Sequence, residues 1–335
     1  MIAPVLLLAL SSVVSAIPVK RAQPTDWMQA NIGLLGSRPL IHIAIPGSHD
    51  AGMSVIGAGT AFSDAANTQT QTLSINQQLV AGSRYFDIRP VISGGAYTTG
   101  HYSDVSVIDS WQGSDGQSIA DVISDINSFT ATNDELVIIN LSHAYDTDGD
   151  NSDYPIFTQA QWEALFTQLL GLNHRYVDPN PTTVDLTRVP LSTFIGSSAA
   201  VLIIIQPDSP VDLGSFASQG FYQYSQLNAY NEYADTNTLS TMESDQLSKM
   251  ASQRGSPDQS YFLLSWTLTQ DALETIGLGD SILTLANSAD PALYTALPPK
   301  LSANTYPNIL YIDNFQNDGK IVDLAMTINT NFAAQ

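Results

Sequence analysis

The sequence predicts a single (β/α)8 barrel of the TIM type, either regular or distorted. Eight short apolar runs are bounded by turn residues, as expected for parallel strands that are buried on both faces. Segments with helical spacing of apolar residues lie between most of these runs. No linker-like segment divides the 335 residues, so one large α/β barrel fits the chain better than two domains.

The expected strands, in chain order, are 40–46, 84–89, 96–101, 136–142, 200–206, 221–225, 261–267 and 308–313. The runs at 96–101 and 221–225 are the weakest of the eight. Helical spacing is clearest before the fourth strand, where Ile119, Val122 and Ile126 recur every three or four residues. Further helices are expected over 73–80, 162–170, 242–250, 282–285 and 321–332, and connections over 146–154 and 173–198.

The N-terminus has the pattern of a targeting segment. Residues 3–10 are apolar, and the tripeptide 14–16 (Val-Ser-Ala) occupies the position of a signal-peptidase site. Lys20 and Arg21 then form a dibasic pair of the kind found at pro-segment cleavage sites. The apolar run is shorter than the ~20 residues that a membrane span needs. We therefore expect residues 1–21 to be a signal peptide with a short pro-segment, residues 22–335 to form the barrel, and the protein to be secreted.

Composition excludes several classes of protein. Acidic residues outnumber basic residues by 32 to 11, giving a net charge of -21, which excludes nucleic-acid binding through a basic stripe. The same surplus opposes firm electrostatic docking on anionic membranes, so we expect at most transient membrane contact. The absence of cysteine excludes disulfides, thiolate catalysis and Cys-ligated metals. We expect a monomer that needs no cofactor.

Ionisable side chains are concentrated where the expected strands end. In chain order, they are His49, Asp50, Asp87, Arg89, His101, His143 and Asp313. The carboxyl ends of barrel strands face the active site, so these side chains should meet. Two imidazoles can serve as base and acid in one turnover, and a guanidinium presents a planar fork to phosphate oxygens. The set therefore suits acid–base chemistry on an anionic substrate.

Four segments give the sequence a resemblance to a known family. The runs 43–50 (IAIPGSHD) and 82–90 (GSRYFDIRP) resemble the first two motifs of phosphatidylinositol-specific phospholipase C X domains. The pair 100–101 (GH) is similar to the next motif, and 136–143 (LVIINLSH) to the family's fourth strand. The motifs occur in family order, within a resemblance that runs from Trp27 to about Phe315.

The resemblance implies a role for each matching residue. His49 would be the general base on the attacking hydroxyl, and His101 the general acid for the leaving alcohol. Arg89 would bind the phosphate, Asp313 would orient His49, and Asp50 would support His101. The implied reaction forms a cyclic phosphodiester that can later be hydrolysed.

The same motifs bear on metal use. Calcium-dependent members carry Asn after the first His, whereas this chain has Asp50, and Arg89 stands where one calcium ligand would be. A guanidinium beside Asp87 can supply the positive charge that the metal supplies elsewhere. The sequence therefore resembles the bacterial, metal-independent subtype, and we expect no metal.

Three residues are candidates for contact with substrate: Asp87, His143 and Trp266. The alternatives are that Asp87 positions Arg89, that His143 is structural and that Trp266 packs in the core. No basic residues match those that hold the inositol ring in bacterial relatives, because the fifth strand ends in Gln206-Pro207-Asp208. The substrate is therefore a phospholipid or another phosphodiester. The alternatives are a phosphodiesterase for another headgroup, such as a glycerophosphodiester or sphingolipid, and a catalytically silent barrel that binds a ligand.

Overall fold

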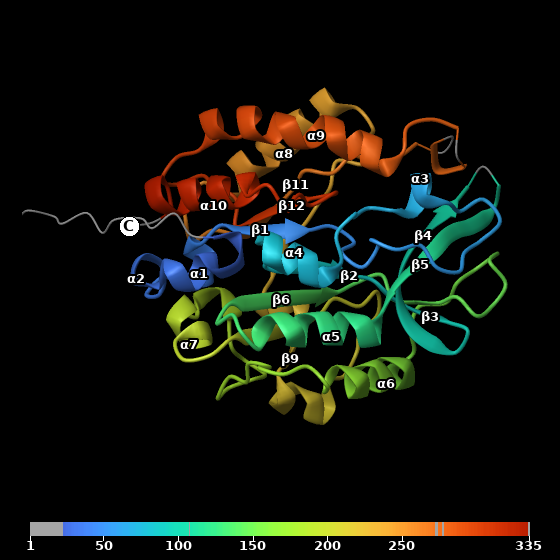
Figure 1. Ribbon diagram of the computed structural model, residues 1–335, viewed down its shortest axis with the longest axis horizontal. Coiled ribbons are helices and arrows are strands. Elements are labelled where there is room, and N and C mark those ends of the chain that lie inside the picture. Colours follow the sequence, from blue (N-terminus) through green and yellow to red (C-terminus); the bar gives the residue numbers. More distant parts are fainter. Residues whose placement is uncertain (1–22, 107, 272–273, 277, 334–335) are drawn as a thin grey trace, which may run out of the picture.

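The computed structural model describes residues 23–106, 108–271, 274–276 and 278–333, which form two sheets surrounded by helices (Figure 1). The predicted signal peptide and pro-segment, residues 1–21, lie outside the described residues. The larger sheet has eight strands, and the smaller sheet has four. In Figure 1 the smaller sheet lies at one end of the larger one, beyond the carboxyl ends of β1 and β6.

The eight-stranded sheet is the predicted barrel. Its order is β10 (Ala229–Tyr230), β11 (Tyr261–Ser265), β12 (Ile309–Ile312), β1 (Ile45–Ser48), β2 (Tyr85–Ile88), β6 (Leu136–Leu141), β8 (Ala200–Ile205) and β9 (Phe221–Gln223). Every pairing in it is parallel. Within the described residues no ladder joins β9 to β10, so the barrel is distorted by an open seam. A cavity of about 670 Å³ is lined partly by residues of this seam, including Tyr224, Tyr230 and Tyr261.

One predicted barrel strand was wrong. Residues 96–101 belong to β4 (Ala96–Val105), which pairs antiparallel with β3 (Pro90–Ser93) and β5 (Ser110–Ser118) in the smaller sheet. The fourth strand of that sheet, β7 (Tyr145–Asp146), runs parallel to β3. Gly94 and Gly95 have φ of 59° and 72°, which is the two-residue hairpin turn that only residues tolerant of positive φ form easily. β2 therefore pairs directly with β6, and the unpredicted strand β10 beside β11 brings the barrel sheet to eight strands.

The predicted helices are confirmed. They are α4 (Ile75–Ala81), α5 (Ile119–Thr130), α6 (Gln159–Leu169), α8 (Leu239–Gln253), α9 (Ile282–Ala296) and α10 (Lys320–Asn331). Short helices add α1 (Trp27–Ala30), α2 (Ile32–Leu35), α3 (Ala65–Thr68) and α7 (Leu191–Ile195). Single 3-10 turns occupy η1 (Pro24–Asp26), η2 (Leu40–His42), η3 (Leu186–Arg188), η4 (Gly214–Gln219), η5 (Tyr224–Gln226), η6 (Glu274–Ile276) and η7 (Pro298–Lys300). Side-chain caps on Ser74, Ser118, Thr158 and Ser281 start four of the long helices.

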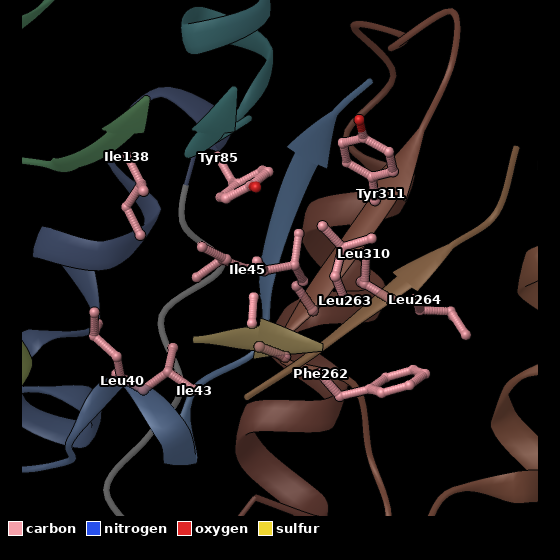
Figure 2. Packing of buried hydrophobic residues seen from close by; sticks show 14 of the residues in the cluster. Leu40, Ile43, Ile45, Tyr85, Ile138, Phe262, Leu263, Leu264, Leu310 and Tyr311 are labelled. Carbon is pink, nitrogen blue, oxygen red and sulfur yellow. The ribbon is translucent and has the colours of Figure 1, made fainter. Parts of the chain in front are cut away.

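Alternation along the strands fills the barrel with side chains. Ile45, Tyr85, Ile138, Leu263 and Tyr311 belong to one buried cluster (Figure 2). Gly47 lies between two of these side chains on β1, where a Cβ atom would come within 2.7 Å of Ile309 Cγ2. A second cluster packs the outer face of β2, β6 and β8 against α4, α5 and α6. No helix among the described residues is long and apolar enough to cross a membrane.

A buried ion pair joins the amino-terminal ends of β2 and β6. Arg84 Nε lies 2.9 Å from Glu135 Oε2, and both side chains are fully buried. Glu135 also accepts hydrogen bonds from the backbone N–H groups of Met28 and Gln29. The guanidinium donates to four backbone carbonyls, including those of Leu79 and Thr25. This pair therefore attaches the first segment of the described chain to the barrel floor.

Substitution of Arg84 should destabilise the protein strongly. Arg84→Met leaves the Glu135 carboxylate buried without a cation, which typically costs about 3–5 kcal/mol of unfolding free energy. Urea denaturation followed by fluorescence would measure this loss. The matched control is Arg188→Met, because Arg188 pairs with Asp258 at an exposed site where such pairs contribute less than about 1 kcal/mol. Equal losses in the two variants would contradict a structural role for the Arg84–Glu135 pair.

Candidate active site

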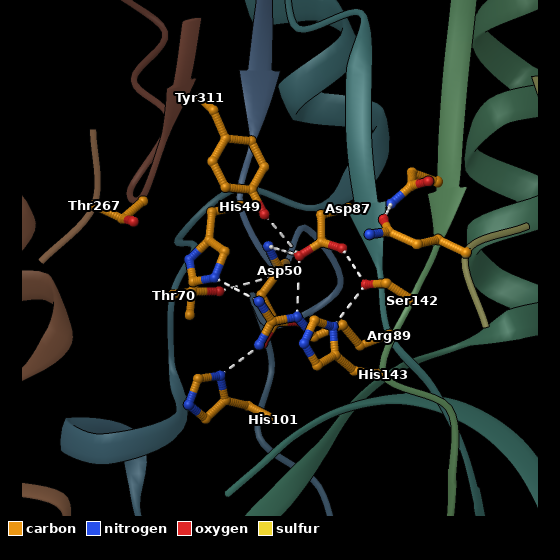
Figure 3. A network of polar contacts seen from close by, with 12 residues as sticks. His49, Asp50, Thr70, Asp87, Arg89, His101, Ser142, His143, Thr267 and Tyr311 are labelled. Carbon is orange, nitrogen blue, oxygen red and sulfur yellow. Dashed lines mark hydrogen bonds and ion pairs between the residues drawn. The ribbon is translucent and has the colours of Figure 1, made fainter. Parts of the chain in front are cut away.

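The predicted catalytic side chains meet at the carboxyl end of the barrel. His49 and Asp50 directly follow β1, Asp87 lies on β2, and Asp313 directly follows β12. His101 reaches the same place from β4 of the smaller sheet (Figure 3). The β3–β4 hairpin therefore supplies the histidine that the barrel was expected to supply from a third strand.

Arg89 lies at the centre of this cluster. Its Nε atom donates to Asp87 Oδ2 over 3.0 Å, and its NH2 group lies 2.7 Å from His49 Nε2. Its NH1 group is 3.7 Å from Asp50 Oδ2. Burial lowers the pKa of a guanidinium, but the carboxylates of Asp87 and Asp50 more than offset burial, so the pKa of Arg89 is raised. Arg89 is therefore a permanent positive charge at the barrel mouth.

His49 has the tautomer that a general base needs. The guanidinium of Arg89 can only donate, so His49 Nε2 must accept, and the ring proton must lie on Nδ1. Nδ1 then donates to Asp313 Oδ1 over 2.6 Å. Burial lowers the pKa of His49 most, and Arg89 lowers it further, but the charge and hydrogen bond of Asp313 together with the charge of Asp87 offset both, so the pKa is raised above its ordinary 6.5. Asp313 thus strengthens His49 as a base and also orients the ring.

His101 is held by the second carboxylate. Its Nδ1 lies 2.7 Å from Asp50 Oδ2, which leaves Nε2 as the nitrogen that can carry a transferable proton. Asp50 is fully buried and has φ of 39°, in the left-handed region that Asp tolerates better than most residues. This backbone conformation turns the chain sharply after β1, so that His49 and Asp50 can serve two different partners.

Asp87 lies behind Arg89, which favours the positioning role over direct contact with substrate. The carboxyl is 4% exposed, and both oxygens are occupied by donors. Oδ2 accepts from Tyr311 Oη over 2.7 Å as well as from Arg89, while Oδ1 accepts from Ser142 Oγ over 2.7 Å. Burial raises the pKa of Asp87, but the charges of Arg89 and His49 more than offset it and hold the pKa well below its usual range. Asp87 therefore stays ionised and positions Arg89.

Tyr311 and Ser142 were not singled out from the sequence. Both residues are nearly fully buried, and each donates to Asp87. Ser142 directly precedes His143 at a strand end, and Tyr311 lies two residues before Asp313 on β12. Alternation places residues 311 and 313 on the same side of a strand, so this spacing could have indicated that the Tyr311 side chain faces the site.

His143 lies at the mouth beside this cluster. Ser142 Oγ already donates its proton to Asp87, so its contact with His143 Nδ1 at 2.9 Å requires Nδ1 to donate. His143 Nε2 is then an acceptor on an exposed side chain. The charge of Arg89 and then desolvation lower the pKa of His143, so the ring is neutral at pH 7. A position that contacts substrate, as the sequence predicted, is compatible with this geometry.

Trp266 does not line the site, which corrects its predicted role. Its side chain is 1% exposed, and its Nε1 donates to the Ala289 carbonyl on α9 over 2.9 Å. Trp266 follows β11, and its side chain packs with the helices outside the barrel. The physical reason is that a Trp N–H needs a partner when buried, and the α9 backbone supplies it.

No group of three His, Asp or Glu side chains in the described parts of the chain is arranged to hold a metal ion. The carboxylates of the site are instead engaged by donors. Asp50 binds His101, and Asp87 binds Arg89, Tyr311 and Ser142.

Comparison with solved structures identifies the fold. The phosphatidylinositol-specific phospholipase C of Listeria monocytogenes superposes with a TM-score of 0.63 and 18% identity, covering 93% of this chain and 100% of that chain. The enzyme of the same name from Staphylococcus aureus gives a TM-score of 0.63 and 15% identity, covering 92% and 98% of the two chains. The chain therefore has the distorted barrel fold of the bacterial phosphatidylinositol-specific phospholipases C.

Sequence comparison points to the same group of proteins. A 1-phosphatidylinositol phosphodiesterase of Listeria monocytogenes is 44% identical over 73 residues, which is 22% of each protein. A PI-PLC X-box domain-containing protein of Dictyostelium discoideum is 29% identical over 140 residues, or 37% of this chain. These matches span only 22% and 17% of the lengths of the two relatives. No family model matches the chain. The predicted resemblance to the phosphatidylinositol-specific phospholipase C X-domain family is thus confirmed in sequence and in fold, and relatives of this kind are phosphodiesterases by name.

The contact between Asp313 and His49 should be visible in the titration of the histidine. The imidazole of His49 should titrate above 6.5, because Asp313 stabilises its protonated form. Asp313→Asn keeps a hydrogen-bond acceptor but removes the charge, so the pKa of His49 should fall. NMR titration of the histidine ring signals measures this change, with exposed His174 as the internal control. An unchanged His49 midpoint in the variant would show that Asp313 does not control its basicity.

Proposed function

We propose that the protein is a phosphodiesterase of the phosphatidylinositol-specific phospholipase C type that uses two histidines as base and acid. The observation that carries this proposal is the arrangement of two imidazoles around one guanidinium, each imidazole held through Nδ1 by its own carboxylate. This arrangement leaves both Nε2 atoms available for proton transfer and leaves Arg89 available for a phosphate oxygen. Similarity to relatives with this activity supports the proposal.

The first step follows from these positions. A phosphodiester anion binds Arg89 and replaces its contact with His49 Nε2. His49 Nε2 removes the proton from a hydroxyl group on the same substrate, and that oxygen attacks phosphorus. The bond from phosphorus to the leaving alcohol breaks, and His101 Nε2 donates its proton to the departing oxygen. The products are a cyclic phosphodiester and an alcohol, and Arg89 offsets the charge that develops on the phosphoryl oxygens.

Hydrolysis of the cyclic product reverses the roles of the two histidines. His101, now neutral, removes a proton from water, and the hydroxide oxygen attacks phosphorus. The ring P–O bond breaks, and His49, now protonated, returns its proton to the ring oxygen. Each histidine thereby recovers its starting protonation state.

A specific observation favours keeping a second headgroup class open. Among the described residues, Arg89 is the one Lys or Arg side chain in the catalytic cluster. The residue that follows β8 is Gln206, which is not basic. Gln206 Oε1 accepts from Asn140 Nδ2 over 2.7 Å, so this side of the mouth offers amides. The alternative function is therefore a phosphodiesterase with the same mechanism and a different headgroup, such as a glycerophosphodiester or sphingolipid.

Removal of either histidine should abolish most of the activity. His49→Ala or His101→Ala should lower turnover of a soluble chromogenic inositol phosphodiester by at least ~10²-fold, because general acid–base catalysis contributes about that much. His42→Ala is the matched control, because His42 binds Asp258 away from the mouth. Activity within tenfold of wild type in either site variant would exclude the assignment. Turnover of other phosphodiesters alone would favour the second headgroup class, and binding without any turnover would indicate a silent barrel.

We propose further that the reaction needs no metal, because the positive charge of Arg89 lies between the two carboxylates that could otherwise bind one. Treatment with a chelator should leave the rate unchanged, as measured in the same chromogenic assay before and after dialysis. A loss of activity that calcium or magnesium restores would show that Asp50 or Asp87 is a metal ligand.

The mouth also has an apolar rim, defined here as Val55, Phe62 and Leu278, which are 52%, 55% and 66% exposed. Val55 and Phe62 lie in the connection after β1, and Leu278 lies in the connection after β11. Asn67 Nδ2 joins the two connections by donating to the Phe62 and Thr275 carbonyls. We propose that the protein is secreted and that it contacts lipid surfaces briefly through the apolar rim, without help from basic residues.

Binding to vesicles should therefore depend on the rim rather than on charge. A Phe62→Ser, Leu278→Ser variant should bind neutral phospholipid vesicles less than wild type does, while turning over the soluble substrate normally. Vesicles rich in anionic lipid should repel both proteins, and added salt should relieve this repulsion because it screens charge within ~8 Å. Co-sedimentation across a salt series measures both effects. Tight binding to anionic vesicles that weakens with salt would reveal a basic surface and contradict the proposal.

A further inference from the structure

One buried carboxyl near the site has no role in the proposed reaction. Asp290 lies on α9 and is partly exposed as a residue, but its Oδ1 atom is buried without a hydrogen-bond partner. Asn287, one helical turn earlier, has its Oδ1 3.2 Å from Asn314 Nδ2, and Asn314 directly follows Asp313. This face of α9 therefore lies against the end of β12, behind the carboxylate that orients His49.

The charges around Asp290 are all negative. Asp313 at the end of β12 and Asp318 in the connection to α10 are the charged groups that act on it, and Tyr294 on α9 is the remaining titratable neighbour. Lys320 does not neutralise the group, because its Nζ lies 2.6 Å from Asp318. A negative charge on a buried carboxylate oxygen that has no donor is unfavourable, so the protonated form is preferred. Burial and then the charges of Asp313 and Asp318 raise the pKa of Asp290 to about 8.

We propose that Asp290 is a positioning residue that remains protonated while the site is active, so that it adds no negative charge to that of Asp313 behind His49. This inference rests on the proposed function, because it concerns binding of an anionic phosphodiester. Ionisation of Asp290 at alkaline pH adds a negative charge near Asp313, which contacts His49, which in turn contacts Arg89. That charge opposes the anion that Arg89 binds, so alkaline pH weakens substrate binding through a residue that never touches substrate.

The test is a comparison of KM and kcat between pH 6 and 10. In the wild type, KM for the soluble phosphodiester should rise severalfold as the pH passes 8, while Asp290→Asn, which cannot ionise, should lack this rise. Changes in kcat that come from His49 and His101 should appear in both proteins. The control variant is Asp134→Asn, which removes an exposed carboxylate at the start of β6 and should keep the wild-type profile. The same KM profile in Asp290→Asn and wild type would overturn the proposal.

Two measurements keep the inference separate from the proposed activity. Carbon-13 NMR of the wild-type protein should show the Asp290 carboxyl titrating near 8, and an ordinary value near 4 would overturn the inference whatever the substrate is. Sulfate, whose charge is constant over this range, should lose affinity between pH 7 and 9 more in wild type than in Asp290→Asn. If the NMR titration and the sulfate affinities come out as expected but no phosphodiester is turned over, the proposed function is wrong. The inference that Asp290 is protonated at neutral pH is then still supported.

Discussion

A buried guanidinium organises the catalytic end of this protein. Arg89 could not occupy the mouth of an apolar barrel without negative partners, because an uncompensated charge at such a site is very unfavourable. Asp87 and Asp50 supply that compensation, and each then binds a further functional group. Asp87 accepts hydrogen bonds from Tyr311 and Ser142, which fix its position, while Asp50 binds His101. The carboxylates that neutralise Arg89 therefore also position the histidines. Asp50 binds His101 directly, and Asp87 fixes Arg89, which contacts His49.

The barrel is distorted in a way that serves this arrangement. The hairpin after Arg89 leaves the barrel wall, and β4 returns His101 over the mouth instead of forming a third wall strand. In the wall, β2 pairs directly with β6, and the short strand β10 pairs with β11 alone, which leaves the seam beside β9 open. Inside the barrel, Gly47 gives Tyr85 and Ile309 the space they need, and Tyr85 packs edge-on against Tyr311 at 6.1 Å. The Tyr311 hydroxyl donates to Asp87, which in turn accepts from Arg89. The packing of the barrel interior therefore helps to fix the position of Arg89.

Charge is distributed unequally between the two ends of the barrel. Arg84 is buried at the amino-terminal end, paired with Glu135 and surrounded by backbone carbonyls, so its role is structural. Arg89 is partly accessible at the other end, and its positive charge faces the mouth. The chain has 32 acidic and 11 basic residues, and the apolar rim of Val55, Phe62 and Leu278 lies on connections that follow β1 and β11. A neutral lipid surface with an anionic phosphodiester fits such a mouth better than a strongly anionic surface does.

The sequence by itself determined most of the barrel and most of the site. Apolar runs such as 136–141 and 200–205 became β6 and β8, because buried parallel strands require apolar residues on both faces. The polar residues at their ends converged, because carboxyl ends of parallel strands share one edge. The strand that carries His101 was predicted wrongly although its signal is local, because the Gly94-Gly95 pair forms a two-residue hairpin turn that sends β4 back antiparallel to β3. Only the tertiary structure decided that Trp266 faces α9, that Asp87 lies behind Arg89 and that Asp290 lies within reach of the charge of Asp313. Those outcomes depend on contacts between segments far apart in the chain, and no local pattern of residue types encodes them.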